Sequence, residues 1–437
     1  MKTLILDGSQ AGDTIGSFST ATLQSNLAER GWNSEMVVLR DKKIGNCMGD
    51  FLCWLKNPGK CHLADDHLEI CRKYLESDLV ILLTPITFGG YSSTLKKMLD
   101  HQIQTTLPFF TTIDGEIHHQ KRYDHYPDVL IIGWQNEPDS ESDSIFRHLA
   151  WRNSINFYAG VYRCGILYRN QSESVMKEQL HRWINHIARR QSDSAASLPQ
   201  LNPSSAPATS VRRALLLVGS PRREKSTSSS LGSYLFEQLQ QHGVETETIV
   251  LYKAITTAER AERIEALRHA LDGADLVVLA FPLYVDTLPA PLIAVLEDVA
   301  AHGKAKAKPT RFAAIVNCGF PEASQNASAI AVCAEFARSA GFAWMGALSL
   351  GAGEGMVRAL PLPELGGQGA PLRRALEMAA AELAVGNSIS DKARELLAKP
   401  LMPVWLYKLG GTIGWTMRAR KFGTLKLLKA KPHLKVV

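Results

Sequence analysis

A short apolar segment that breaks into a loop of Gly, Ser and Thr, and then into a helical pattern, occurs twice in this 437-residue chain. The first copy runs from Leu4 to Ser17 and the second from Leu215 to Ser228. Each copy predicts a strand, an anion-binding loop and a helix. Backbone N–H groups at a helix start carry a partial positive charge and, together with hydroxyl groups, can hold a phosphate. The chain is therefore expected to contain two copies of one fold, each with a phosphate socket.

The repeat continues beyond these loops. Residues 77–87 and 274–284 each form an apolar, β-rich run that ends in a proline-containing loop and is followed by a helical pattern. Further apolar runs over 129–133 and 312–317 alternate with helical patterns. Such alternation predicts an α/β fold with a doubly wound parallel sheet, whose ligand lies outside the carboxyl ends of the strands. We expect two tandem domains of this kind, each with three αβα layers.

Changes in composition suggest the domain boundaries. We place a first domain at 1–190, a linker at 191–210, a second domain at 211–395 and a basic helical extension at 396–437. The linker is rich in Ser, Ala, Pro, Asn and Thr, and is too polar to offset its own ordering entropy.

The net charge of +6 is concentrated at the C-terminus, where the last twenty residues hold seven Lys or Arg and no Asp or Glu. The remaining body is close to neutral, which argues against a nucleic-acid-binding protein. We expect the extension to form a helix or arm that packs on the second domain. The alternative is weak contact with an anionic membrane surface.

The seven cysteines are an odd number and do not suggest a disulfide framework. Met1 leads directly into an apolar strand pattern rather than a signal peptide, so we expect a cytoplasmic protein. No apolar run reaches the roughly 18 to 20 residues that are needed to span a bilayer.

Several of these motifs resemble a known family. The run Gly219-Ser220-Pro221-Arg222, with Ser226 and Ser228 and the later run 281–284, resembles the flavodoxin-like NAD(P)H-dependent FMN reductases. The first half is similar to the same superfamily through Gly8-Ser9, residues 85–91 and Lys96. Its cysteine-containing segment, with Cys47, Cys53, Cys61 and Asp65-Asp66, resembles the iron-sulfur-flavoprotein-like branch. The resemblance covers most of the chain and implies bound FMN with NAD(P)H as co-substrate.

The resemblance also implies site residues. In each half, the loop after the first strand would hold the FMN phosphate, and the proline-containing loop would border the isoalloxazine ring. In the first half these are Ser9, Gln10, Thr14, Gly16 and Ser17 for the phosphate, and Pro85, Ile86, Thr87, Phe88 and Gly89 for the ring. In the second half they are Ser220, Arg222, Ser226 and Ser228 for the phosphate, and Pro282, Leu283 and Tyr284 for the ring. No catalytic side chain is assigned, because the flavin supplies the chemistry.

The main flavin site is expected in the first half. There Gly89-Gly90 lets the backbone approach a planar ring, whereas the second half has Val285-Asp286-Thr287 at that place, with an acid near the electron-rich edge of the flavin.

The three cysteines of the first half are expected to be reduced thiols without a metal. Asp50 occupies the second ligand position of the run Cys47-x2-Asp50-x2-Cys53-x7-Cys61, and a carboxylate is a rare iron-sulfur ligand. The alternatives are an iron-sulfur centre on the three thiols and a redox-active pair. We expect Asp65 to be the N-cap of the helix that follows it.

We therefore expect an enzyme that passes electrons from NAD(P)H through FMN to a quinone, a nitro or azo compound, or a similar small-molecule acceptor. One alternative is an electron-transfer flavoprotein, with or without an iron-sulfur centre, that docks to a redox partner protein. Another is a binding or scaffold protein whose sockets are relics. The expected assembly is a homodimer, or a monomer in which the tandem copies imitate one.

Overall fold

The computed structural model of the chain describes residues 1–204, 209–252, 260–301 and 309–433. Part of the predicted linker, residues 205–208, lies outside the described residues. The chain divides into two compact units, Met1–Pro199 with Lys408–Val437, and Gln200–Tyr407. Each unit is described by itself below.

The first unit is built on five parallel strands in the order β2-β1-β3-β7-β8. This order is that of the doubly wound flavodoxin-like sheet, in which the ligand lies at the carboxyl ends where the order reverses. The strands are β1 (Lys2–Asp7), β2 (Asn33–Val38), β3 (Leu79–Thr87), β7 (Asp128–Gln135) and β8 (Tyr162–Tyr168).

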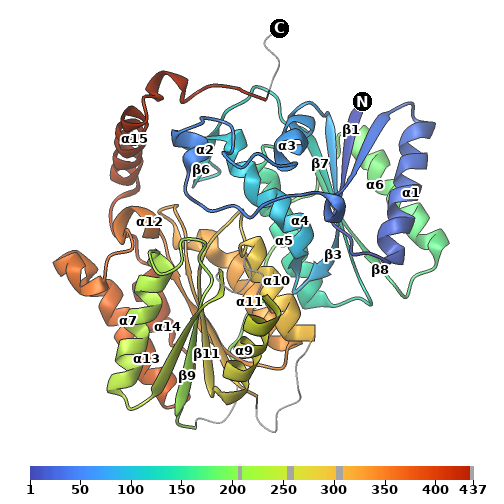
Figure 1. The fold of residues 1–437 in the computed structure, drawn as a ribbon. Helices are drawn as coiled ribbons and strands as arrows, with labels where there is room; N and C mark the ends of the chain where they lie inside the picture. Colours follow the sequence, from blue (N-terminus) through green and yellow to red (C-terminus); the bar gives the residue numbers. More distant parts are fainter. Residues whose placement is uncertain (205–208, 253–259, 302–308, 434–437) are drawn as a thin grey trace. The chain divides into compact units, whose positions relative to one another are not determined.

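Helices cover both faces of this sheet (Figure 1). On one face α1 (Thr14–Glu29) and α6 (Glu173–Ala188) share an apolar core with the strands. The other face carries α3 (His67–Leu75), α4 (Ser93–Leu99) and α5 (Ser140–Asn156). A two-stranded antiparallel hairpin of β5 (Thr106–Ile113) and β6 (Glu116–Lys121) is inserted before β7.

The second unit repeats the arrangement with the parallel order β10-β9-β11-β12-β13. The strands are β9 (Arg213–Val218), β10 (Glu245–Val250), β11 (Leu276–Pro282), β12 (Arg311–Asn317) and β13 (Ala343–Leu350). One face is covered by α7 (Thr227–Gln241), α13 (Ala370–Ala384) and α14 (Asp391–Ala398), and the other by α9 (Arg260–Gly273), α10 (Ala290–Ala301) and α11 (Ala327–Ser339) (Figure 1). The predicted fold class, two tandem αβα domains, is confirmed.

The C-terminal arm, which we define as residues 408–433, packs on the first unit. The buried Arg122 donates from Nη1 to the carbonyl oxygens of Leu428 (2.9 Å) and Ala430 (2.8 Å). Trp415, on α15 (Val404–Lys421), lies edge-on against Trp54 with ring centroids 5.2 Å apart. The extension was predicted to pack on the second domain; residues 396–407 do belong to the second unit, but the prediction is wrong for the arm from Lys408 onward. A buried guanidinium needs acceptors, and the arm supplies them from more than 300 positions away in sequence.

Among the described helices, none combines the length and the apolar character needed to cross a membrane.

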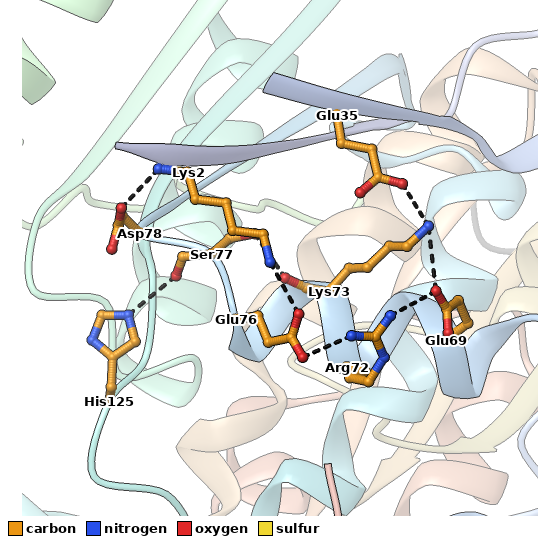
Figure 2. A network of polar contacts seen from close by, with 9 residues as sticks. All are labelled: Lys2, Glu35, Glu69, Arg72, Lys73, Glu76, Ser77, Asp78 and His125. Carbon is orange, nitrogen blue, oxygen red and sulfur yellow. Dashed lines mark hydrogen bonds and ion pairs between the residues drawn. The ribbon is translucent and has the colours of Figure 1, made fainter. Parts of the chain in front are cut away.

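Near the amino ends of the strands of the first unit, a polar network ties α3 to β1 and β2 (Figure 2). Lys2 donates from its backbone N to Asp78 Oδ2 (2.7 Å) and from Nζ to Glu76 (3.0 Å), and Lys73 pairs with Glu35. Exposed pairs of this kind are each worth about 0–1 kcal/mol. Since ligands of such sheets bind at the opposite, carboxyl ends, we interpret the network as structural.

Candidate functional site

In the first unit, the loops at the carboxyl ends of three neighbouring strands meet. Gly8 donates its N–H to Leu83 O (2.8 Å), and the Ser92 hydroxyl donates to Gly8 O (3.0 Å). Trp134, at the end of β7, donates from Nε1 to Asp13 Oδ2 (2.8 Å). The predicted phosphate loop thus lies beside the loop after β3 and the loop after β7, as the doubly wound order requires.

The first socket contains a carboxylate. Asp13 is the N-cap of α1, and its Oδ1 accepts the N–H groups of Ile15 (3.0 Å) and Gly16 (3.2 Å). These are the donors that a phosphate at this helix start would need, and the carboxylate adds like charge at the same place. Sequence reasoning missed Asp13, although an Asp immediately before a helical pattern is a recognised N-cap signal.

Of the other residues predicted for the first socket, some are buried at the loop and others are exposed. Ser9 is buried and its hydroxyl accepts from Arg40 Nη1 (2.9 Å). Thr14 is exposed and its hydroxyl accepts from Arg169 Nη1 (3.1 Å). Gly16 approaches Ser9 so closely that a Cβ at Gly16 would lie 2.6 Å from Ser9 Cβ. The exposed residues Gln10 and Ser17 complete the predicted set. The two arginines were not found from sequence, because only folding brings them to this loop.

The second socket is lined by hydroxyls. Ser226 is the N-cap of α7, and its hydroxyl accepts the N–H of Ser229 (3.1 Å). Within the described residues, no acceptor contacts the backbone N–H of Thr227 or Ser228. The buried Ser228 hydroxyl accepts from Asn317 Nδ2 (2.8 Å) at the end of β12. This helix start therefore has open N–H donors where the first unit has the carboxylate of Asp13.

Arg222 supplies a cation to the second socket. Its backbone N donates to the buried Ser220 hydroxyl (3.3 Å), and its Nη1 pairs with Glu354 Oε2 (2.6 Å). Both side chains of the pair are about one-third exposed, so water screens the interaction. An anion in the socket can therefore compete with Glu354 for the guanidinium. Glu354 lies on the short helix α12 (Gly353–Met356) and carries no sequence signal that would have linked it to Arg222.

The turns expected to border the flavin ring have the same backbone form in both units. Phe88 (φ 53°) and Gly89 (φ 71°) are left-handed in the first turn, and Val285 (φ 43°) and Asp286 (φ 61°) in the second. Two consecutive left-handed residues define the tight two-residue turn that joins antiparallel strands. The second half therefore makes the same turn without glycine. The backbone of the turn gives no reason to place the flavin in the first half rather than the second.

These turns lie beside the sockets. Residues 85–88 and 282–284 are half-buried at the carboxyl ends of β3 and β11, the strands that pair with β1 and β9. In the second unit Leu283 donates its N–H to Asn317 O (2.8 Å). Asn317 also contacts Ser228 through its side chain. Asn317, at the end of β12, therefore connects the start of α7 with the turn after β11.

The cysteine segment of the first unit does not provide the ligands of a four-thiolate cluster. Its run of candidate ligands contains three cysteines, Cys47, Cys53 and Cys61. The remaining ligand position is Asp50, whose Oδ1 accepts the N–H of Leu52 (3.0 Å). Three thiols and a hydrogen-bonded carboxylate do not fit the usual set of four cysteine ligands.

Comparison with protein families matches residues 1–110 to the NADPH-dependent FMN reductases and residues 212–331 to a family described as having a flavodoxin-like fold. Both halves thus match flavodoxin-like families, and the first half matches the FMN reductases. This match confirms the predicted flavoprotein class and its FMN cofactor at the level of the family.

The curated proteins that this chain resembles include iron-sulfur flavoproteins. That of Methanocaldococcus jannaschii is 35% identical over 100 residues, which are 23% of this chain and 51% of the relative. One from Archaeoglobus fulgidus is 30% identical over 101 residues, which are 23% and 48% of the two chains. The chain therefore spans about half the length of these curated relatives.

A solved NAD(P)H:quinone oxidoreductase from Methanothermobacter marburgensis is 17% identical, with a TM-score of 0.30, over 39% of this chain and 96% of that one. This likeness is too weak to carry an argument.

Proposed function

We propose that the protein is an NAD(P)H-dependent FMN oxidoreductase whose working flavin is bound by the second unit. The observation that supports this placement is the second socket, in which buried hydroxyls, open N–H donors and Arg222 surround a helix start. A phosphate needs this combination of donors and positive charge. The match of the first half to the NADPH-dependent FMN reductases supports the reaction type.

This placement departs from the sequence-based expectation of a main flavin site in the first half. Asp13 satisfies the N–H donors of Ile15 and Gly16, so a phosphate there would have to displace a carboxylate and its hydrogen bond from Trp134. The glycine argument that favoured the first half does not separate the two turns. The FMN-binding role of the residues named for the first half remains a prediction. The Asp13 carboxylate argues against it, because it occupies the N–H donors that the phosphate would need.

In the second unit the residues divide into two groups by role. The hydroxyls of Ser220, Ser226 and Ser228 and the guanidinium of Arg222 would hold the phosphate, with Arg222 leaving Glu354 to do so. Residues 282–284 would border the ring. FMN, when bound, accepts hydride from NAD(P)H and passes electrons to the acceptor. The chain's contribution is to orient the cofactor with fixed donors, and no side-chain acid or base is assigned.

The proposed acceptor is a quinone, a nitro or azo compound, or a similar small molecule. The alternative, an electron-transfer flavoprotein that docks to a redox partner, is supported by the names of the curated relatives. Anaerobic mixing of the protein with NAD(P)H distinguishes the oxidoreductase from the electron-transfer flavoprotein. Bleaching of the bound flavin by NAD(P)H alone supports the oxidoreductase, and reduction only by a partner protein supports the alternative. The cytoplasmic location and the oligomeric state stay predictions.

We also propose that α15 contacts an anionic membrane surface. Its exposed apolar residues Trp405, Leu409, Ile413 and Met417 recur every fourth position and so share one helical face. Their exposed fractions are 67%, 51%, 50% and 60%. The chain carries no Asp or Glu after Glu395, whereas Arg420, Lys421 and Lys426 follow the apolar face. An exposed apolar face next to basic side chains is typical of helices that lie on anionic membranes.

Vesicle sedimentation tests this contact. The full chain should sediment with phosphatidylserine vesicles at low salt and much less with phosphatidylcholine vesicles, because each basic side chain near an anionic surface contributes about 1 kcal/mol. The triple change Arg420→Ala, Lys421→Ala and Lys426→Ala should weaken binding about 100-fold. Ile413→Ser should also weaken it, whereas Leu360→Ser, at an exposed apolar residue outside the helix, is the matched control. Equal sedimentation with both vesicle types, or with neither, would refute the contact.

A further inference from the structure

Three side chains of the first unit converge on one point outside the flavin loops. Cys61 is half-buried, and His67 and His101 are buried. One ligand atom of each lies within 4.8 Å of the ligand atoms of the other two. The two imidazoles stack with their ring centroids 4.0 Å apart. His67 begins α3, and His101 lies in the 3-10 turn that follows α4, so two separate elements position them.

The hydrogen bonds of the two histidines leave one ring nitrogen of each as a lone-pair donor. The Asp65 carboxylate can only accept, so His67 donates from Nδ1 to it, and His67 Nε2 keeps its lone pair. His101 donates from Nε2 to the carbonyl of Gly45 (2.9 Å), which leaves Nδ1. Carboxylates and backbone carbonyls that accept from the far ring nitrogen are the usual outer contacts of metal-bound histidines.

His67 Nε2 is buried and has no hydrogen-bond partner among the described residues. Leaving a buried polar nitrogen unpaired costs free energy that a ligand would recover.

Asp65 and Gln104 hydrogen-bond to the residues of the cluster. Asp65 was expected to be the N-cap of α3, but the helix has Asp66 in that position. Asp65 Oδ1 still accepts the backbone N–H of His67, the first residue of α3, and it also accepts from the His67 ring, while Oδ2 accepts the N–H of Gly45 (2.8 Å). The carboxylate therefore fixes the His67 ring beside Gly45, whose carbonyl oxygen accepts from His101. The Cys61 N–H donates to Gln104 Oε1 (2.9 Å), which is also contacted by His433 of the arm (3.3 Å).

We propose that Cys61, His67 and His101 bind one divalent transition-metal ion of the zinc type. One thiolate and two neutral imidazoles are a ligand set that Zn2+ accepts, and three protein ligands leave the fourth tetrahedral position open. This site needs only one of the three cysteines in the segment 47–61. It is therefore distinct in its ligands from a cluster held by thiolates alone.

Cobalt substitution tests the site without reference to activity. The full-length chain is stripped with a chelator and titrated with Co2+ in the absence of oxygen. It should bind one Co2+ with a thiolate-to-cobalt charge-transfer band, and Zn2+ should displace the cobalt and raise the melting temperature. Cys61→Ser should remove the band. His101→Gln should weaken binding at least about tenfold, and Asp65→Asn about 10- to 100-fold through loss of the outer contact.

Cys53→Ser is the matched control, because Cys53 is a neighbouring buried thiol outside the three ligands. It should leave the stoichiometry and the band unchanged. Circular dichroism of each variant establishes that it is folded. The proposal is overturned if the wild-type chain binds no stoichiometric cobalt, if Cys61→Ser retains the band, or if Cys53→Ser abolishes it, since the last result would indicate a multi-thiolate centre.

Discussion

Replacing Ser226 by aspartate should yield a folded chain without FMN. The change places at the start of α7 the same carboxylate that Asp13 places at the start of α1. Aspartate is as good an N-cap as serine, so the helix should form. A unit charge at about 4 Å from the phosphate costs about 4 kcal/mol at a surface-like dielectric, which corresponds to a dissociation constant about 1,000-fold higher. Flavin absorbance per purified chain and titration of the apo-protein with FMN measure the loss.

Two matched variants control this experiment. Ser226→Asn keeps a capping side chain without the charge and should retain most of the flavin. Asp13→Asn removes the carboxylate of the first socket and should leave the flavin content of the second socket as it was. A fully flavin-loaded Ser226→Asp protein would show that the phosphate is bound elsewhere.

Lys96→Ala should destabilise the first unit by about 3–5 kcal/mol. Lys96 and Asp100 form an ion pair one helical turn apart, with side-chain exposures of 0% and 1%. Removing the ammonium takes away the ion-pair partner of the buried Asp100 carboxylate, whose desolvation cost the pair offsets. Urea unfolding followed by circular dichroism should show the transition of this unit at clearly lower urea concentration.

Lys97→Ala is the matched control for this change, because Lys97 lies on the same helix but is only half-buried. It should shift the free energy of unfolding by no more than about 0.5 kcal/mol. Equal effects of the two substitutions would contradict the assignment of the Lys96–Asp100 pair as a buried, coupled ion pair.

The repeated strand–loop–helix pattern was sufficient to predict the two parallel sheets. The apolar runs at 79–83 and 276–280 form the strands that pair with β1 and β9, so the loops that follow them lie next to the phosphate loops. This success has a physical basis, since buried parallel strands are continuous apolar runs and their carboxyl ends share one edge.

Sequence reasoning failed where side chains act across long separations. The hairpin β5–β6 was not predicted. The packing of the C-terminal arm depends on the buried Arg122, which no local pattern reveals. In the same way, Arg169 reaches the first socket from the loop after β8, and Trp134 reaches it from the end of β7. Cys61, His67 and His101 fit no spacing motif and converge only in the folded unit.

The two turns expected to border the flavin ring show a different error in the sequence-based reasoning. Glycine was treated as the residue that a close backbone approach requires, yet Val285 and Asp286 adopt the same left-handed turn as Phe88-Gly89. A left-handed conformation is unfavourable for a β-branched residue such as Val285, so the surrounding structure must impose it. The sheet and the paired strand ends therefore determine this turn more strongly than its own residues do.

Anaerobic titration of the purified full-length chain with NADPH and NADH tests the central proposal most directly. The account predicts one FMN per chain, bleached completely by about one equivalent of the preferred nucleotide and reoxidised by an added quinone. It also predicts that the Ser226→Asp chain is colourless and the Asp13→Asn chain is not. A yellow chain that no nicotinamide nucleotide bleaches, or one that keeps its flavin in Ser226→Asp, would contradict it.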